Sequence, residues 1–443
     1  MMLLVGNGCL VTRNAKNPVV DAGAVAIDSD RIVEIGDTTV LRGKYPGATF
    51  VDAAGGLIMP GLINTHMHFY SSFARGMDLK AQSPQEFGQI LERLWWRLDK
   101  VLTPEDVYYS AAVAMMDCIR NGVTTVFDHH ASPGCVEGSL FQIADAAKEL
   151  GLRTCLCYEV SDRDGEAVAA QGIAENAAYI RDCQQANDPM RRALFGLHAS
   201  FTLNDDLLRR SAEQAAELAA GCHIHTSEAL SDADDCRRRY GKRVVERLRD
   251  FGVLGPASIA AHCVHVDPYE MEILQQQQSL VVHNPESNMG NAVGCAPVLA
   301  MLRQGVRVGL GTDGYTADML ESLKVANLLH KHVQRDASVA WAEPHEMLFG
   351  QNAAFASACF GETLGRIVPG APADVIVLDY EPPTPLSAEN LGAHILFGCM
   401  GRAVRTTVVN GRVLMQDRQI LVADSAKIAA GARQQAEKLW QRF

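Results

Sequence analysis

Two pairs of histidines in this 443-residue chain have a spacing that suits metal binding. His66 and His68 stand two residues apart in PGLINTHMHFY, and CHIHTSE places His223 and His225 at the same spacing. Side chains alternate between the two faces of a strand, so the members of each pair point to one side. An isolated pair of this kind is a weak signal for a metal site. His225 lies nearer the end of its segment and is the expected ligand, whereas we interpret His223 as a buried, hydrogen-bonded core residue.

Three more polar residues near the ends of apolar segments could complete a hydrolytic centre. Glu228 follows His225 by three residues, where its carboxylate could shuttle a proton. His262 ends the apolar run in SIAAHCVHV, and Asp313 follows the apolar residues of VRVGLGTDG. A carboxylate at the end of a buried strand must be paired or bound to a metal. We therefore favour metal binding by Asp313 over the alternative, a capping role at the start of the following helix.

Together these residues predict a site for one divalent metal ion. Three imidazoles and one carboxylate are the expected ligands: His66, His68, His225 and Asp313. This set suits Zn²⁺, and it would also accept Fe²⁺ or Mn²⁺. A metal ion lowers the pKa of a coordinated water to about 7. Asp313 could then also accept the proton of that water, His262 could stabilise an oxyanion, and Glu228 could protonate a ring nitrogen or a leaving group.

The elements that must position these residues alternate in type along the middle of the chain. Short apolar segments that end in polar residues are separated by longer helical stretches such as PEDVYYSAAVAMMDCIRNG. Eight such segments predict a (β/α)₈ barrel over residues 59–364, with its chemistry at the carboxyl ends of the strands. The segments are PGLINTHMHFY, TTVFDHHASP, LRTCLCYEV, ALFGLHASF, CHIHTSEA, SIAAHCVHV, SLVVHNPESN and VRVGLGTDGYT.

Both ends of the chain are rich in short β-type segments. LLVGNGCLVT and AVAIDSDRIVEIG lie near the start, and ADVIVLDY and RTTVVNGRVLMQD lie near the end, where Asn410 and Gly411 indicate a tight hairpin turn. We expect residues 1–58 and 365–443 to form one discontinuous β-sandwich domain with a C-terminal helix.

Composition excludes several classes of protein. The chain carries 40 basic and 52 acidic residues, a net charge of −12, which disfavours binding to nucleic acid. No run of 18 apolar residues occurs, so we expect no membrane span, and the start MMLLVGNGCLVTRN is interpreted as a strand rather than a signal peptide. The 12 scattered cysteines form no CxxC pair and favour a reducing cytoplasm. The expected partner is a small molecule.

Several motifs together resemble one enzyme superfamily. PGLINTHMH, HIHTSE, AAHCVH, HNPESNMG and GLGTDG, followed by APADVIVLD, are similar to the amidohydrolase superfamily, in its branch of aminohydrolases, chlorohydrolases and deaminases of heterocycles. LWWRLD, FDHHASP and PTPLSAENLGAHILFG resemble more narrowly the aminohydrolases called SsnA. The resemblance covers nearly the whole chain. It implies the same four metal ligands, a catalytic pair of Glu228 and His262, and a homodimer as a frequent assembly.

The chain departs from some relatives at two places. No lysine stands at the end of a middle strand where it could bridge two metals, which favours one metal over a binuclear, hydantoinase-like or urease-like centre. The triplet Asp128-His129-His130 ends one predicted strand. His129 could contact the substrate there, or the triplet could form a local turn, and the sequence leaves both open.

Two further residues are candidates for shaping the substrate site. His198 ends the segment ALFGLHASF, and the resemblance implies that a histidine at such a strand end often touches the substrate. Trp95 and Trp96 are adjacent in LERLWWRLDK, and adjacent residues of a helix point about 100° apart. Trp95 could therefore form an aromatic wall for a flat ring, although both tryptophans could instead pack in the core.

These observations predict a metal-dependent aminohydrolase that deaminates a small, purine-like nitrogen heterocycle. Two enzymatic alternatives keep the site and change the bond that breaks, namely hydrolytic dechlorination and hydrolysis of a cyclic amide. A third alternative is a metal-binding scaffold without catalytic turnover.

Overall fold

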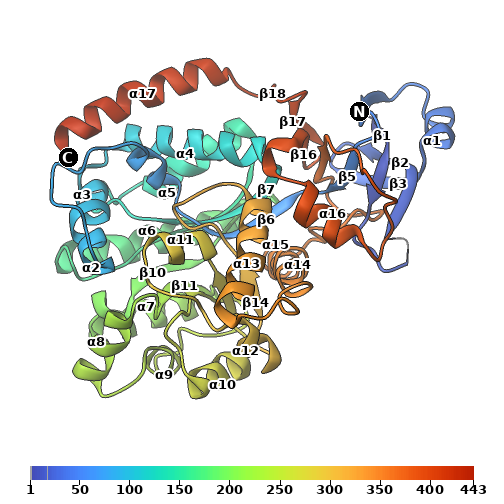
Figure 1. The fold of residues 1–443 in the computed structure, drawn as a ribbon. Coiled ribbons are helices and arrows are strands. Elements are labelled where there is room, and N and C mark those ends of the chain that lie inside the picture. The colour runs from blue at the N-terminus through green and yellow to red at the C-terminus, as the bar shows by residue number, and fades with distance from the viewer. Residues whose placement is uncertain (1, 17) are drawn as a thin grey trace.

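The central part of the protein is a closed barrel of parallel strands (Figure 1). The computed structural model describes residues 2–16 and 18–443. Parallel bridges between Val160 and Leu197 and between Met67 and Asp313 join two parallel sheets into a ring. The prediction of a (β/α)₈ barrel is thus confirmed. Its strands are β6 (Leu62–Met67), β7 (Val123–His130), β8 (Arg153–Tyr158), β10 (Phe195–Ala199), β11 (Cys222–Thr226), β12 (Ile259–His262), β13 (Leu280–His283) and β14 (Val308–Leu310).

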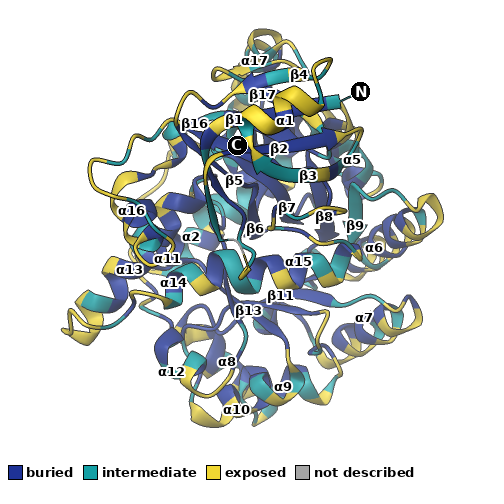
Figure 2. Ribbon diagram, turned by 90° about the vertical axis from the view of Figure 1, so that its right-hand side faces the viewer, coloured by how far each residue is buried: buried dark blue, intermediate teal, exposed yellow. Residues whose placement is uncertain are grey.

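Helices surround the barrel, and each has an exposed outer face, as the yellow segments on α6 and α7 in Figure 2 illustrate. The first long helix, α4, begins with a capping box in which Thr103 and Asp106 bond to each other's backbone, and Pro104 occupies its first turn. The helices of the barrel are α4 (Pro104–Arg120), α5 (Ser139–Leu150), α6 (Glu166–Ala186), α7 (Asp205–Glu217), α8 (Leu230–Tyr240), α9 (Val244–Asp250), α10 (Pro268–Gln277), α11 (Pro285–Gly290), α12 (Val298–Arg303), α13 (Met319–Gln334), α14 (Glu343–His345) and α15 (Asn352–Phe360).

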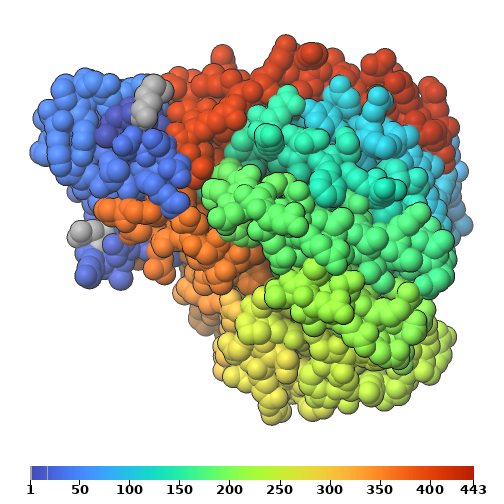
Figure 3. Space-filling model, turned by 180° about the vertical axis from the view of Figure 1, so that it is seen from behind, coloured from blue at the N-terminus to red at the C-terminus, as the bar shows by residue number. Residues whose placement is uncertain are grey.

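Strands from both ends of the chain form one further sheet beside the barrel. Figure 3 shows the blue N-terminal and red C-terminal segments side by side at one corner of the molecule. The hydrogen-bonded order is β18-β17-β16-β15-β5-β1-β2-β3, and β4 pairs with β1. A shared hydrophobic cluster joins the two halves, for example through Val25 and Val375. The strands are β1 (Met2–Val11), β2 (Val19–Asp28), β3 (Arg31–Asp37), β4 (Thr49–Asp52), β5 (Leu57–Pro60), β15 (Val375–Leu378), β16 (Val404–Val409), β17 (Arg412–Gln416) and β18 (Gln419–Ile420).

The C-terminal helix α17 (Ser425–Arg442) lies along α4 of the barrel, as Figure 1 shows. Trp440 donates a hydrogen bond from Nε1 to the carbonyl oxygen of Phe73 at 2.8 Å, and Arg442 pairs with Asp106. The predicted boundaries group this helix with the small domain, whereas these contacts attach it to the barrel. The exact boundaries stay a prediction. Within the described residues, no helix is both long enough and apolar enough to cross a lipid bilayer.

Candidate metal centre and cavity

The first and last strands of the barrel meet where His66 and Asp313 lie. The backbone N–H groups of Thr312 and Asp313 both donate to the carbonyl oxygen of His66, at 3.1 and 3.0 Å. Gly311 permits this approach, because a Cβ atom at that position would lie 3.0 Å from Cβ of His66 and 2.8 Å from Cγ1 of Val282. The ring closure of the barrel therefore brings the Asp313 carboxylate beside the histidine pair of β6.

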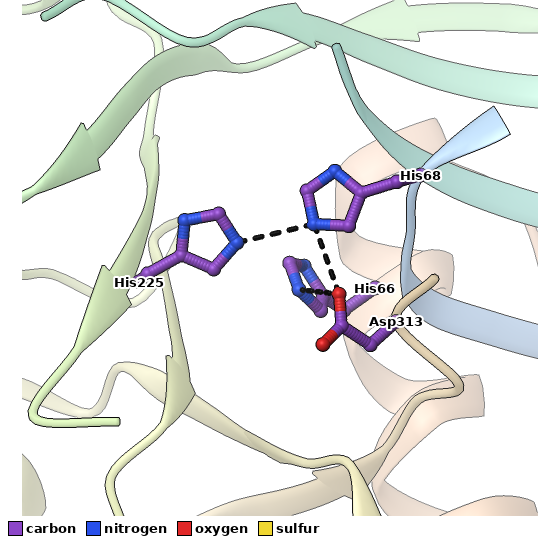
Figure 4. Close-up of side chains that lie close together, drawn as sticks. All are labelled: His66, His68, His225 and Asp313. Atoms are coloured by element: carbon purple, nitrogen blue, oxygen red, sulfur yellow. Dashed lines mark hydrogen bonds and ion pairs between the residues drawn. The ribbon is translucent and has the colours of Figure 1, made fainter. Parts of the chain in front are cut away.

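The four predicted metal ligands converge at this end of the barrel (Figure 4). Oδ1 of Asp313 lies 3.0 Å from Nε2 of His68 and 3.5 Å from Nε2 of His66, and Nε2 of His68 lies 3.1 Å from Nε2 of His225. Ligand atoms of a tetrahedral zinc site, with bonds of about 2.0–2.2 Å, are separated by about 3.3 Å. Nε2 of His66 is buried and has no hydrogen-bond partner among the described residues. The donor set and its spacing thus fit one divalent cation.

Backbone carbonyl groups orient two of these rings. Nδ1 of His68 lies 2.5 Å from the carbonyl oxygen of His129, and Nδ1 of His225 lies 2.9 Å from that of His198. A carbonyl oxygen can only accept, so each Nδ1 carries a proton. The neutral form of each ring then directs the lone pair of Nε2 toward the other ligands, which is the arrangement that metal binding requires.

His66 is oriented by another histidine one layer deeper in the barrel. Nδ1 of His66 lies 2.8 Å from Nε2 of His223, whose side chain is buried. Burial lowers the pKa of His66 to about 3, so the ring is neutral at physiological pH and can offer a lone pair. His223 is therefore a buried, hydrogen-bonded residue whose ring contacts a predicted metal ligand.

The charges of His68 and Asp313 depend on each other. Burial alone would lower the pKa of His68, but its hydrogen bond and charge interaction with Asp313 raise that pKa to about 9. Burial would likewise raise the pKa of Asp313, but the close approach of the His66 and His68 rings holds it well below its ordinary range. Ser287 also donates from Oγ to Oδ2 of Asp313 at 2.5 Å. A proton on His68 therefore occupies the position that a metal ion would take.

The predicted catalytic pair lies beside the same carboxylate. Nε2 of His262 is 3.5 Å from Oε2 of Glu228 and 3.8 Å from Oδ2 of Asp313, and Nδ1 of His262 contacts Oδ1 of Asn288 at 2.8 Å. Burial raises the pKa of Glu228 to about 7. The backbone of His262 and Asp313 is left-handed, with φ angles of 72° and 54°, a strained conformation that is typical of functional sites. These residues can hold and move protons next to the metal ligands.

A cavity lined by aromatic side chains opens above the metal ligands. Trp95, the candidate wall residue, lines it, and so does its neighbour Trp96. His198 also lines the cavity, and burial lowers its pKa to about 4. The main lining side chains are His68, Tyr70, Phe87, Leu91, Trp95, Trp96, Asp99, Glu159, His198, Phe201, His225, Glu228, Asp232, Ser287, Asn291, Asp313 and Tyr315.

The Asp128-His129-His130 triplet lies below the cavity rather than on its wall. Asp128 accepts a hydrogen bond at 2.7 Å from the backbone N–H of Phe69, which directly follows His68. His129 uses both ring nitrogens, Nδ1 toward Oε1 of Glu159 and Nε2 toward the carbonyl oxygen of His223, each at 3.0 Å. His129 is not one of the side chains that line the cavity. The contacts of the triplet instead hold His68 and Glu159 in place.

The structure adds one acidic residue that we did not single out from the sequence. Glu159 directly follows β8, lines the cavity and has a side chain that is only 4% exposed. Burial alone would raise its pKa, but the nearby His129 outweighs burial and holds that pKa well below its ordinary range. The other candidates were polar residues near the end of an apolar segment, and Glu159 has the same place in LRTCLCYEV. This signal could have identified Glu159 from the sequence.

Comparison with known proteins assigns the family. Residues 57–414 match the model of the amidohydrolase family, and residues 23–48 match a bacterial imidazolonepropionase-like composite domain. The first match spans most of the chain, so the protein belongs to the amidohydrolase family. The predicted superfamily is confirmed, and the narrower resemblance to the SsnA aminohydrolases is consistent with it.

Several proteins that are similar along nearly the whole chain are deaminases. The protein is 33% identical over 444 residues to 5′-deoxyadenosine deaminase of Methanosarcina mazei, with 99% of each chain covered. It is 32% identical over 449 residues to 5-methylthioadenosine/S-adenosylhomocysteine deaminase of Pelotomaculum thermopropionicum, again with 99% of each covered. A zinc-bound adenosine deaminase from Xanthomonas campestris shares the fold, with a TM-score of 0.87, 24% identity and coverage of 99% and 98%.

Proposed function

We propose that this protein is a metal-dependent aminohydrolase that hydrolytically deaminates a small, purine-like nitrogen heterocycle. The observation that carries the proposal is the convergence of four metal-ligand side chains beside Glu228 and His262 at the base of an aromatic cavity. The relatives named above are deaminases of adenosine derivatives, which supports a purine-type substrate.

We propose that one metal ion, Zn²⁺, is held by His66, His68, His225 and Asp313. When bound, this ion supplies a Lewis acid that activates water at neutral pH. A second possible ligand group, His68, His129, Glu159 and His225, shares two members with the first. Each residue offers one ligand atom, so His68 and His225 cannot serve both groups, which favours a single ion.

The side chains of the site suit the proton transfers of a deamination. Asp313 accepts the proton of the attacking water, and its contact with Ser287 orients the carboxylate. Glu228, whose pKa burial raises to about 7, holds a proton near neutral pH and delivers it to a ring nitrogen. His262 stabilises the developing oxyanion through Nε2, which lies 3.5 Å from Oε2 of Glu228 and 3.8 Å from Oδ2 of Asp313.

The cavity residues divide into two roles in this proposal. Trp95 provides a flat apolar wall for the ring, and His198 contacts a polar edge of the substrate. His129, for which the sequence suggested substrate contact, instead supports His68 and Glu159 through its hydrogen bonds. A cytoplasmic location and a homodimer stay predictions from the sequence and the family resemblance.

A substrate screen with the zinc-loaded protein tests the proposal. We expect ammonia release from at least one aminopurine base or nucleoside. Chloride release from chlorotriazines, or ring opening of hydantoins, in the absence of any ammonia release would support the dechlorinating or amide-hydrolysing alternative. One bound metal per chain without hydrolysis of any compound would support a catalytically silent scaffold.

A further inference from the structure

The cavity wall between β8 and β10 presents two polar side chains that no described residue connects. Oε2 of Glu159 lies 3.9 Å from Nε2 of His198, beyond hydrogen-bond distance. Their side chains are 4% and 8% exposed. Both line the same cavity.

Glu159 has one oxygen engaged and one oxygen available. His129 donates from Nε2 to the carbonyl oxygen of His223, and its Nδ1 lies 3.0 Å from Oε1 of Glu159. In the part of the chain that the structure describes, no hydrogen bond reaches Oε2. Arg163, a basic side chain nearby, pairs with Asp99 and Asp164 instead. Oε2 is therefore a hydrogen-bond acceptor that the protein itself does not satisfy.

His198 is held by a contact on the side of its ring that faces away from Glu159. Nδ1 of His198 lies 2.7 Å from Oγ1 of Thr202, and the same hydroxyl lies 3.2 Å from the carbonyl oxygen of Ala199. Thr202 therefore fixes the ring and leaves Nε2 beside Oε2 of Glu159 with no hydrogen bond between them. Oε2 of Glu159 is thus the acceptor on this wall that a ligand must satisfy.

We propose that Oε2 of Glu159, beside His198 on this wall, selects substrates whose facing edge carries an unsubstituted ring N–H group, such as a free nucleobase or a related cyclic lactam. The inference rests on the proposed function and goes beyond it by naming Glu159 as the residue that determines this specificity. A ring substituted at the facing nitrogen would leave a buried carboxylate oxygen unpaired, and such a loss strongly disfavours binding. The relatives named above act on nucleosides, so the proposal separates this chain from them.

Equilibrium binding to the full-length, zinc-loaded protein tests the proposal without turnover. The probes are hypoxanthine, which has no amino group to hydrolyse, and its 1-, 3-, 7- and 9-methyl derivatives. We expect at least one methyl derivative to bind about 100-fold more weakly than hypoxanthine to the wild type. In Glu159→Gln the amide oxygen can face His129 while the amide NH₂ faces the cavity, so the acceptor is replaced by a donor. Hypoxanthine should then bind about 100-fold more weakly than to the wild type, and the methyl derivative should bind about as well as hypoxanthine.

Matched controls separate recognition from folding and metal binding. Glu175→Gln changes another buried glutamate, one that accepts bonds from Gly138 and Leu140, and it should leave all affinities unchanged. Zinc content is measured for every variant. If Glu159→Gln loses zinc, the binding series is repeated with His198→Asn. This variant should show a smaller difference in affinity between hypoxanthine and the sensitive methyl derivative than the wild type does.

Two results would overturn the inference. One is a wild type that binds every methyl derivative as tightly as hypoxanthine, and the other is a variant that keeps the full methyl discrimination. Failure of the proposed function looks different, because the protein would then release no ammonia from any aminopurine while the methyl series still depended on Glu159. Equal deamination of free bases and all their N-substituted forms would reject the inference and keep the function.

Discussion

Nδ1 of His66 lies 2.8 Å from Nε2 of His223, so a buried histidine one layer below the metal ligands orients one of them. His223 and the ligand His225 belong to the same strand, β11, and point to the same side. The deeper member of this pair therefore acts through His66 rather than on the substrate. Such outer contacts fix the orientation of a ligand ring and tune its affinity for the metal.

Replacement of His223 should weaken metal binding. We expect His223→Ala to lower the affinity for zinc about 10- to 100-fold, because His66 would lose the partner of Nδ1. Competition with a chromophoric chelator measures the change. His345→Ala is the matched control, because His345 bonds to the carbonyl oxygens of Trp341 and Gly392. Equal zinc affinity in His223→Ala and the wild type would show that the contact does not position His66.

Removal of the Asp313 carboxylate should abolish both metal binding and turnover. Asp313→Ala deletes the one carboxylate among the four ligands, and we expect the zinc content to fall far below one ion per chain. The rate of deamination should fall at least about 1000-fold. Elemental analysis and an ammonia assay measure these two effects. Asp232→Asn, which alters another buried cavity carboxylate, should keep its zinc. An active Asp313→Ala enzyme would end the proposed mechanism.

Loss of the Glu228 proton donor should slow chemistry without removing the metal. Glu228 is not among the four ligands, and Glu228→Gln keeps the size of the side chain and its contact with Asn291. We expect kcat to fall about 100- to 10,000-fold while the zinc content stays at one ion per chain. Steady-state kinetics on the substrate found in the screen measure the effect. A variant with normal kcat would assign the proton transfer to another group.

Metal binding should release a proton and so depend on pH. The interaction with Asp313 raises the pKa of His68 to about 9 in the metal-free protein, so below that pH a metal ion must displace a proton from Nε2. We expect zinc affinity to rise about tenfold per pH unit between pH 6 and 8.5, because one proton leaves for each ion bound. Chelator competition at several pH values measures the slope. Affinity that does not change with pH would contradict the proton on His68.

Much of the site could be predicted because its signals are local. The alternation of side chains along a strand places His66 and His68 on one face whatever the rest of the chain does. The carboxyl ends of barrel strands share one rim, so polar residues that end apolar segments are expected to meet there, and the structure brings His225, His262 and Asp313 to that rim. The barrel and the paired ends of the chain follow from the same patterns.

Only the tertiary structure decided how the remaining residues act. His129 belongs to a conspicuous triplet, yet its ring turns beneath the cavity, and Glu159 and His198 become neighbours only when β8 and β10 close side by side. The path of α17 along α4 is likewise a contact between distant parts of the chain. The physical reason is common to all three. Strand periodicity fixes which face a side chain takes, but which partner it meets depends on the register and packing of segments far apart in sequence.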